Sequence, residues 1–183
     1  TGEYESTGGR KAKILSIAPD ISYAVGMDIT RNHISFVLLD VSGRLVFQKR
    51  IRCAFENDDA YYRELGRSLD TFLERCRADR DKILGVGISI PGIVDEERCF
   101  MSQSHVLRLE EFDLKKLAAY IPYRTGFRND ANSAAYAELR GAGQNTIYLS
   151  LSNTVGGAIY INGRIYNGQH FRSAEFGHMI LVP

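Results

Sequence analysis

Tryptophan is absent from this sequence, cysteine and proline are scarce, and neither sign of charge is in excess. The 183 residues include 3 cysteines and 4 prolines, and the formal net charge is +1. Cys53, Cys76 and Cys99 lie far apart, form no Cys-x-x-Cys pair and leave one thiol unmatched if two form a disulfide. We therefore expect free, buried thiols. The small net charge argues against a broad basic face for phosphate backbones, so we expect no direct DNA contact by this chain alone.

Long apolar runs and a leader sequence are missing as well. The longest nearly apolar run, 83–94, is interrupted by glycines and a proline and is shorter than the roughly 18 residues of a membrane-spanning helix. The N-terminal residues have neither the basic region nor the apolar region of a signal peptide. We expect a cytoplasmic protein with no membrane partner. With 44% hydrophobic and 25% charged residues, the chain has the composition of an ordinary globular protein.

The first half of the chain has a pattern of strands, then a helix, then a buried strand. The helix is predicted over 58–78, because apolar side chains recur there at helical spacing. The apolar run 83–90 ends at Pro91-Gly92 and predicts a buried strand, as a βαβ crossover would supply. Three stretches rich in β-branched and aromatic residues predict an antiparallel meander before the helix: 23–29, 34–40 and 45–52, with a tight turn at 41–44 between the last two.

The second half repeats this order in part. An alanine-rich helix is predicted over 131–139, capped by Asn129 or Asp130. A hairpin is predicted around Asn162-Gly163, the strongest short hairpin signal. The other predicted elements are a short helix at 113–120, strands at 123–127 and 146–152, a turn at Gly156-Gly157 and hairpin strands within 158–166. The new strands resemble the start of a second copy, whose apolar face further sequence or a partner chain must cover.

Polar residues suited to a binding site lie in four short segments: Ile88 to Asp95, Asn129 to Asn132, Ser152 to Gly157, and Ser173 to His178. In this order and spacing the segments resemble the ROK family of bacterial sugar kinases and sugar-responsive transcriptional repressors, from about residue 14 to the end. The resemblance implies an α/β, actin-like ATPase fold with two RNase-H-like lobes around a cleft, sugar deep inside and ATP nearer the mouth. It implies a linker at 1–19 after a DNA-binding domain missing from this chain, a first lobe at 20–143 and the truncated start of a second lobe at 144–183.

The resemblance implies that these segments bind the hydroxyl groups of a sugar. Asp130 stands at a strand-to-helix junction, where a carboxylate can cap a helix, accept a hydrogen bond from a hydroxyl or act as a general base. Glu175 and His178 are three residues apart and face the same way on one helical turn. A bare Gly92 lets backbone amides approach a sugar without an intervening Cβ, although Pro91-Gly92 is also a simple turn. The resemblance implies six sugar-binding residues: Pro91, Gly92, Asn129, Asp130, Glu175 and His178.

Both phosphate-binding loops depart from the kinase pattern of the family. The kinases have Asp-x-Gly-Gly-Thr in the first hairpin, whereas Thr30 and Arg31 follow Asp28-Ile29 here. Arg31 is not expected to compensate, because a flexible guanidinium does not replace a nest of backbone amides. The second loop has Asn153-Thr154-Val155 in place of Gly-Thr-Gly. The degraded loops comprise Asp28, Thr30, Arg31, Asn153 and Thr154, with only Gly156 and Gly157 intact.

The sequence thus predicts a sugar-sensing effector domain of a ROK-type transcriptional regulator that binds a hexose or amino sugar and has no catalytic residue. Two alternatives stay open: an ATP-dependent, glucokinase-like sugar kinase with Asp130 as the base, and a dimerisation module that has lost its ligand. The expected partners are a sugar, DNA through the missing helix-turn-helix domain, and a second copy in a homodimer or higher homo-oligomer. No cofactor is expected in this chain. A structural zinc is an expectation for the complete protein, where the resemblance makes His178 a single ligand and the others lie beyond this chain.

Overall fold

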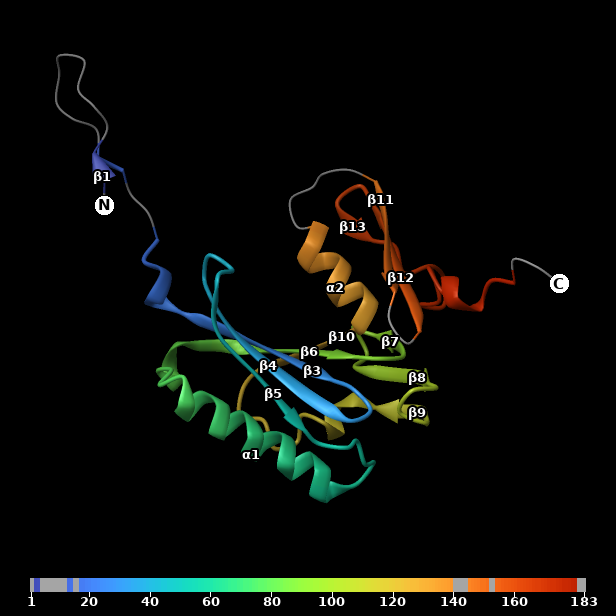
Figure 1. Cartoon of the computed structure of the whole chain (residues 1–183), viewed down its shortest axis with the longest axis horizontal. Coiled ribbons are helices and arrows are strands. Elements are labelled where there is room, and N and C mark those ends of the chain that lie inside the picture. Colours follow the sequence, from blue (N-terminus) through green and yellow to red (C-terminus); the bar gives the residue numbers. More distant parts are fainter. Residues whose placement is uncertain (1, 4–12, 15–16, 140–144, 152–153, 181–183) are drawn as a thin grey trace, which may run out of the picture.

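A five-stranded mixed sheet with a long helix on one face forms the centre of the protein (Figure 1). The structure is a computed structural model that describes residues 2–3, 13–14, 17–139, 145–151 and 154–180. The strands lie in the order β10-β6-β3-β4-β5. Their bounds are Tyr23–Ile29 (β3), His33–Asp40 (β4), Leu45–Arg52 (β5), Ile83–Ile90 (β6) and Thr125–Asn129 (β10).

The strand directions match those expected of an RNase-H-like lobe. Strands β3, β4 and β5 form the predicted antiparallel meander, and β6 and β10 run parallel to β3. The predicted turn between β4 and β5 is closed by buried Asp40, whose carboxylate accepts hydrogen bonds from Ser42 and Arg44. Gly43 has a positive φ of 81° in this turn. The α/β fold class is therefore confirmed.

Helix α1 (Asp59–Arg75) covers one face of this sheet. Its first turn is capped by Asp58, whose side chain accepts a hydrogen bond from the Tyr61 amide at 2.8 Å. The helix buries an apolar stripe that includes Leu65, Leu69 and Phe72. The Phe72 ring stacks on Phe36 of β4, with 5.2 Å between ring centroids. The helical spacing in the sequence thus matches the face that packs on the sheet.

A second, three-stranded sheet lies beyond β6 and was not expected from the sequence. It consists of β7 (Ile93–Asp95), β8 (Phe100–Ser104) and β9 (Leu109–Asp113). The helix expected over 113–120 was wrong in extent, because only the 3-10 turn Leu114–Lys116 forms there. These strands are too short for a clear alternation. Three non-glycine residues within or directly before them have positive φ: Cys99, Arg108 and Glu111.

The remaining helix and sheet carry the C-terminal part of the chain. Helix α2 (Asp130–Leu139) is followed by a sheet of β11 (Thr146–Leu151), β12 (Val155–Ile161) and β13 (Arg164–Ile165). The predicted hairpin is confirmed, because Asn162 and Gly163 both have positive φ between β12 and β13. The predicted turn at Gly156-Gly157 was wrong, since both glycines lie inside β12. A Cβ at Gly157 would collide with the Phe176 ring.

One face of this last sheet is open to solvent among the described residues. Ile147, Leu149 and Leu151 alternate along β11 and are 52–75% exposed. An uncovered apolar face was expected from the order of elements. Nothing among the described residues covers it.

The N-terminal segment contains a little more structure than a simple linker. Gly2–Glu3 (β1) pairs with Lys13–Ile14 (β2), within the segment 1–19 that was expected to be a linker. The residues between these strands lie outside the described part of the chain. The other short elements are the 3-10 turns Pro19–Ile21, Arg80–Lys82 and Phe176–His178. Cys53, Cys76 and Cys99 are free and half-buried. In the described ranges, no helix is long and apolar enough to cross a membrane.

Replacing Phe72 with alanine tests the packing of α1 on the sheet. Phe72 is 1% exposed and contacts both Phe36 and Phe47, so Phe72→Ala should reduce the free energy of unfolding by about 3–5 kcal/mol in urea denaturation. Leu84→Ala is the control, because Leu84 is 65% exposed and its loss should change the free energy by about 0.5 kcal/mol or less. Equal effects of the two variants would contradict this packing.

Candidate functional site

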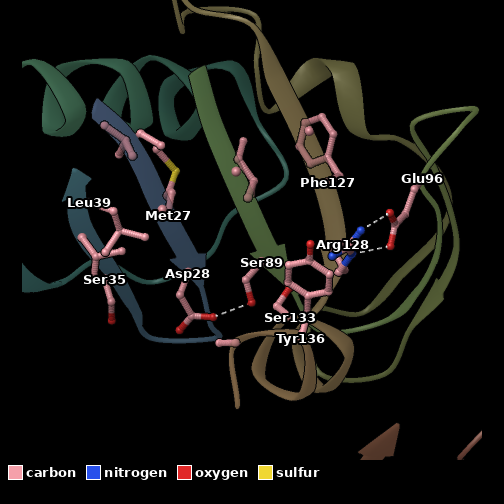
Figure 2. Close-up of a pocket in the computed structure, with 18 residues that line it drawn as sticks. Met27, Asp28, Ser35, Leu39, Ser89, Glu96, Phe127, Arg128, Ser133 and Tyr136 are labelled. Atoms are coloured by element: carbon pink, nitrogen blue, oxygen red, sulfur yellow. Dashed lines mark hydrogen bonds and ion pairs between the residues drawn. The ribbon is translucent and has the colours of Figure 1, made fainter. Parts of the chain in front are cut away.

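Parallel strands β3, β6 and β10 end at one edge of the central sheet, and polar residues gather there. Asp28 and Ser89 are paired in register on β3 and β6. The Ser89 hydroxyl donates a hydrogen bond to Asp28 Oδ1 at 2.9 Å, which Figure 2 shows. Asn129 ends β10 and Asp130 begins α2. The carboxyl edge of a parallel sheet is a usual place for a ligand site.

Asn129 connects helix α2 to the turn after β6. Its Oδ1 accepts a hydrogen bond from the Asn132 amide at 3.0 Å, which caps α2. Its Nδ2 donates to the Gly92 carbonyl oxygen at 2.9 Å and to Asp130 Oδ1 at 3.0 Å. Both Nδ2 protons therefore have acceptors in the protein. Asn129 was expected to contact a sugar, and in the structure its side chain holds Gly92 and Asp130 in position.

Gly92 is required by the backbone at this point. Its φ is +142°, and a Cβ would lie 2.7 Å from the Gln103 carbonyl oxygen. Ser104, buried beside it, donates to the Pro91 carbonyl oxygen at 2.6 Å and accepts from the Leu107 amide at 3.1 Å. We call Pro91, Gly92, Ser104 and Asn129 the strand-end frame. The sequence did not indicate Ser104 as a member.

Asp130 has one carboxylate oxygen engaged within the protein. Oδ1 accepts hydrogen bonds from the Ala131 amide at 2.9 Å and from Asn129. The side chain still contacts solvent, yet crowding by protein atoms raises the pKa of Asp130 above its usual range. The negative charge of Asp28 raises this pKa further, and the hydrogen bond from Ala131 opposes the rise. Oδ2 takes part in neither of these hydrogen bonds, so it can accept one from a ligand.

Glu175 and His178 lie together on a turn from the C-terminal part of the chain. His178 Nε2 is 3.8 Å from Glu175 Oε2, and both side chains are exposed. The turn rests on β12 through the two residues between them: Phe176 covers Gly157, and a Cβ at Gly177 would collide with the Val155 carbonyl oxygen. The predicted common face of Glu175 and His178 is thus confirmed.

The two halves of the predicted site approach each other at a pair of histidines. The ring centroids of His105 and His178 are 6.1 Å apart, and His105 follows Ser104 of the strand-end frame. Sequence reasoning gave His105 no role. Helix α2 also reaches β12, because a Cβ at Gly156 would lie 3.4 Å from that of Ala131. Both contacts place the Glu175 turn beside the strand-end frame.

Two cavities formed by the described residues are not lined by the predicted sugar-binding residues. One is a groove of about 650 Å³ across the sheet face opposite α1, bordered by Asp28, Ser89 and Arg128 (Figure 2). We call it the sheet groove. The other, of about 730 Å³, lies between β7–β8 and the segment 169–172. The strand-end frame adjoins both in the sequence, because Asn129 follows Arg128 of the sheet groove and Gly92 precedes Ile93 of the second cavity.

The first of the two phosphate loops is a closed turn. The Thr30 amide donates to the His33 carbonyl oxygen at 2.9 Å, and the His33 amide donates to Thr30 Oγ1 at 3.1 Å. Both amides are thereby occupied within the turn. Phe55 and Cys53 donate to the carbonyl oxygens of Arg31 and Asn32. In the second loop, Asn153 lies outside the described residues, and Gly156 and Gly157 are strand residues.

The described part of the chain contains no complete set of metal ligands. No three His, Cys, Asp or Glu side chains there lie close enough together to hold a metal ion. His178 has Glu175 as its neighbour, and a structural zinc requires four ligands. The described residues therefore do not fit a zinc site by themselves, and zinc in the complete protein stays a prediction.

The family of the chain follows from comparison with known proteins. The sequence pattern of the ROK family matches residues 24–183, so the chain belongs to the ROK family. The xylose repressor of Bacillus spizizenii is 27% identical, with 98% of this chain and 48% of that protein aligned. The glucokinase of Halalkalibacterium halodurans is 28% identical over 87% of this chain and 50% of that protein. The chain spans about half the length of the curated relatives it matches.

Solved structures support the same fold. A ROK family transcriptional regulator, a homologue of the E. coli MLC protein, superimposes with a TM-score of 0.77 at 20% identity, covering 89% of this chain and 42% of that one. A ROK family glucokinase from Streptomyces griseus, solved with glucose and AMPPNP, gives a TM-score of 0.73 at 26% identity, covering 88% and 52%. The chain therefore has the actin-like ATPase fold, and its relatives include both repressors and kinases.

Two glycine substitutions test the strand-end frame. Gly92→Ala forces a side chain into a positive φ and against the Gln103 carbonyl oxygen, so it should lower the free energy of unfolding by about 1–3 kcal/mol. Gly126→Ala is the matched control, because a Cβ there meets nothing within 4 Å, and it should be neutral or slightly stabilising. Denaturation in urea measures both. A neutral Gly92→Ala would contradict the described turn.

The raised pKa of Asp130 gives a pH dependence of stability with a defined sign. The folded state holds the Asp130 proton more tightly than the unfolded state, whose aspartates titrate near about 3.9. This contribution is fully present below the unfolded pKa and is lost as the pH rises through the folded pKa. Asp130→Asn retains the Oδ1 acceptor without the charge, so its stability relative to the wild type should rise over that window. Urea denaturation at several pH values measures it, and the opposite slope would contradict the assignment.

Proposed function

We propose that this chain is the sugar-sensing effector part of a ROK-type transcriptional regulator and binds a sugar without phosphorylating it. The observation that carries the proposal is a contrast between Asp130 and the Thr30–His33 turn. Asp130 Oδ2, beside the strand-end frame, is available to a hydroxyl, whereas the Thr30–His33 turn uses the amides of Thr30 and His33 for its own hydrogen bonds. Binding a neutral sugar requires a free acceptor such as Oδ2, and holding phosphate requires free backbone amides, which Thr30 and His33 do not offer.

Asp130, Glu175 and His178 are the groups that would contact the sugar in this proposal. Carboxylates accept hydrogen bonds from vicinal hydroxyls, and a histidine can donate or accept. The contact of His105 with His178 supports a sugar position between the strand-end frame and the Glu175 turn. A hexose or amino sugar is the ligand class that we infer. Xylose is included as a candidate because several relatives are named xylose repressors.

Regulation would follow from the same position. A ligand that contacts both the strand-end frame and the Glu175 turn favours the arrangement in which the two are close. A DNA-binding domain joined to the N-terminal segment would respond to that change, and sugar and operator affinities would be linked reciprocally. A dimer with a second copy is part of this proposal, as is a cytoplasmic location.

A sugar kinase is the second candidate, and one observation favours it. The raised pKa of Asp130 suits a general base for a sugar hydroxyl, and glucokinases are among the relatives. Phosphoryl transfer also requires the phosphates to be held and their charge neutralised. The occupied amides of Thr30 and His33 argue against that requirement being met.

Calorimetric titration of the complete protein tests the proposal. The sugars are xylose, glucose, N-acetylglucosamine and N-acetylmannosamine, each with and without ATP. One should bind with no phosphorylated product, and Asp130→Ala and Glu175→Ala should each weaken its binding by about tenfold or more, because each removes a charge-assisted hydrogen bond. Glu74→Ala, on the far side of the sheet in α1, is the control and should leave the affinity unchanged.

Three outcomes would count against this function. Binding of none of the sugars contradicts a sensor, and unchanged affinity in both variants contradicts the site. Sugar phosphorylation above background establishes the kinase instead. Operator binding by the complete protein, measured with and without the bound sugar, then tests whether the ligand controls DNA affinity.

A further inference from the structure

Glu96 and Arg128 form an ion pair between the three-stranded and the five-stranded sheet. Glu96 follows the last residue of β7, in the three-stranded sheet, and Arg128 is the penultimate residue of β10, in the five-stranded sheet. Arg128 Nε and Nη2 donate to the two Glu96 carboxylate oxygens at 2.6 and 2.8 Å. Figure 2 shows the two side chains meeting at the border of the sheet groove.

The geometry of this ion pair restricts the movement of both side chains. Two parallel N–H···O bonds fix the guanidinium and the carboxylate in one plane, which a single surface contact cannot do. The side chains are only 35% and 32% exposed, so water screens the attraction less than at a fully exposed pair. For comparison, the Arg80–Asp70 pair near α1 has a single short bond and is nearly half exposed on both sides.

Tyr136 extends the contact to helix α2. The Arg128 guanidinium carbon lies 5.0 Å from the centroid of the Tyr136 ring, within the range of a cation–π interaction. Tyr136 is on the second turn of α2, and Asp130 is the first residue of the same helix. Arg128 thus contacts the turn after β7 on one side and the helix that carries Asp130 on the other.

Both partners lie next to residues of the candidate site in the sequence. Glu96 is four residues after Gly92, and Arg128 immediately precedes Asn129. The segment from Gly92 to Glu96 is therefore attached to the end of β10 at two points, by Asn129 Nδ2 on the Gly92 carbonyl oxygen and by Arg128 on Glu96. One attachment allows the segment to pivot about it. Two attachments remove that freedom.

Building on the proposed sugar site, we propose that Glu96, Arg128 and Tyr136 are positioning residues that hold the Gly92 turn at a fixed spacing from Asp130. They do not contact the sugar. They reduce the conformational freedom that the two sides of the site lose on binding, which raises affinity without a new ligand contact. Sequence reasoning missed all three, because an ion pair between distant strands has no local signature.

Measuring the sugar affinity of Glu96 and Arg128 variants tests this inference. The measurements use the complete protein at a temperature well below the melting temperature of each variant. Glu96→Gln retains the shape but loses the charge, and Arg128→Lys retains the charge but loses the two-bond geometry. Each should weaken binding by about five- to tenfold, with the double variant little worse than either, since both remove one interaction. The charge reversal Glu96→Arg with Arg128→Glu should recover part of the affinity. Asp70→Asn, which removes the acidic charge from the Arg80–Asp70 pair, should change affinity less than about twofold.

A tyrosine pair isolates the helix contact. Tyr136→Phe retains the ring and should bind as the wild type, whereas Tyr136→Leu should bind about two- to fivefold more weakly. Lower melting temperature with unchanged affinity in Glu96→Gln and Tyr136→Leu would overturn the inference, because it would mark a purely structural contact.

Hydrogen exchange without sugar separates this inference from the proposed function. Glu96→Gln should speed exchange of the backbone amides of 93–95 and of the first turn of α2, whether or not any sugar binds. Faster exchange with no sugar binding by the wild type would contradict the sugar function and retain the positioning role. Unchanged exchange would overturn the positioning role.

Discussion

The hydrogen bond from Asn129 Nδ2 to the Gly92 carbonyl oxygen is the constraint on which the candidate site depends. It joins the end of β10 to the turn after β6 at 2.9 Å, while the other end of the same amide caps α2. A single such bond contributes only about 1 kcal/mol to stability. Its effect on geometry is larger, because it sets where Asp130 lies relative to the Gly92 turn. Ser104 of β8 holds that turn from another strand, and Glu96 attaches the residues after it to Arg128 of β10.

Much of the fold could be predicted from the sequence because local patterns and tertiary packing agree. The spacing of Leu65, Leu69 and Phe72 indicates one helical face, and the structure buries that face. The Asn162-Gly163 pair predicts a hairpin, and both residues have the positive φ that such a turn requires. The β7–β9 sheet was missed because its strands are only three to five residues long and leave no periodic signal.

The candidate site was predicted in part, for a different reason. Motif resemblance identified Asn129, Asp130, Glu175 and His178, and the structure groups them into two pairs that adjoin at His105. Resemblance gave no information on how the pairs are held. Gly157 was expected in a phosphate loop and instead accommodates the Phe176 ring, and Ser104 was not noticed at all. Contacts of this kind depend on residues that are distant in the sequence and adjacent in the fold, so no residue type or spacing in the sequence predicts them.

The central claim is that one sugar occupies the space between the strand-end frame and the Glu175 turn. A crystal structure of the complete protein with the sugar selected by titration is its most direct measurement. The account predicts sugar hydroxyls within about 3 Å of Asp130 Oδ2 and of Glu175 or His178, with Glu96 and Arg128 still paired and not touching the sugar. A sugar bound elsewhere, or Asp130 and Glu175 directed at different spaces, would contradict it.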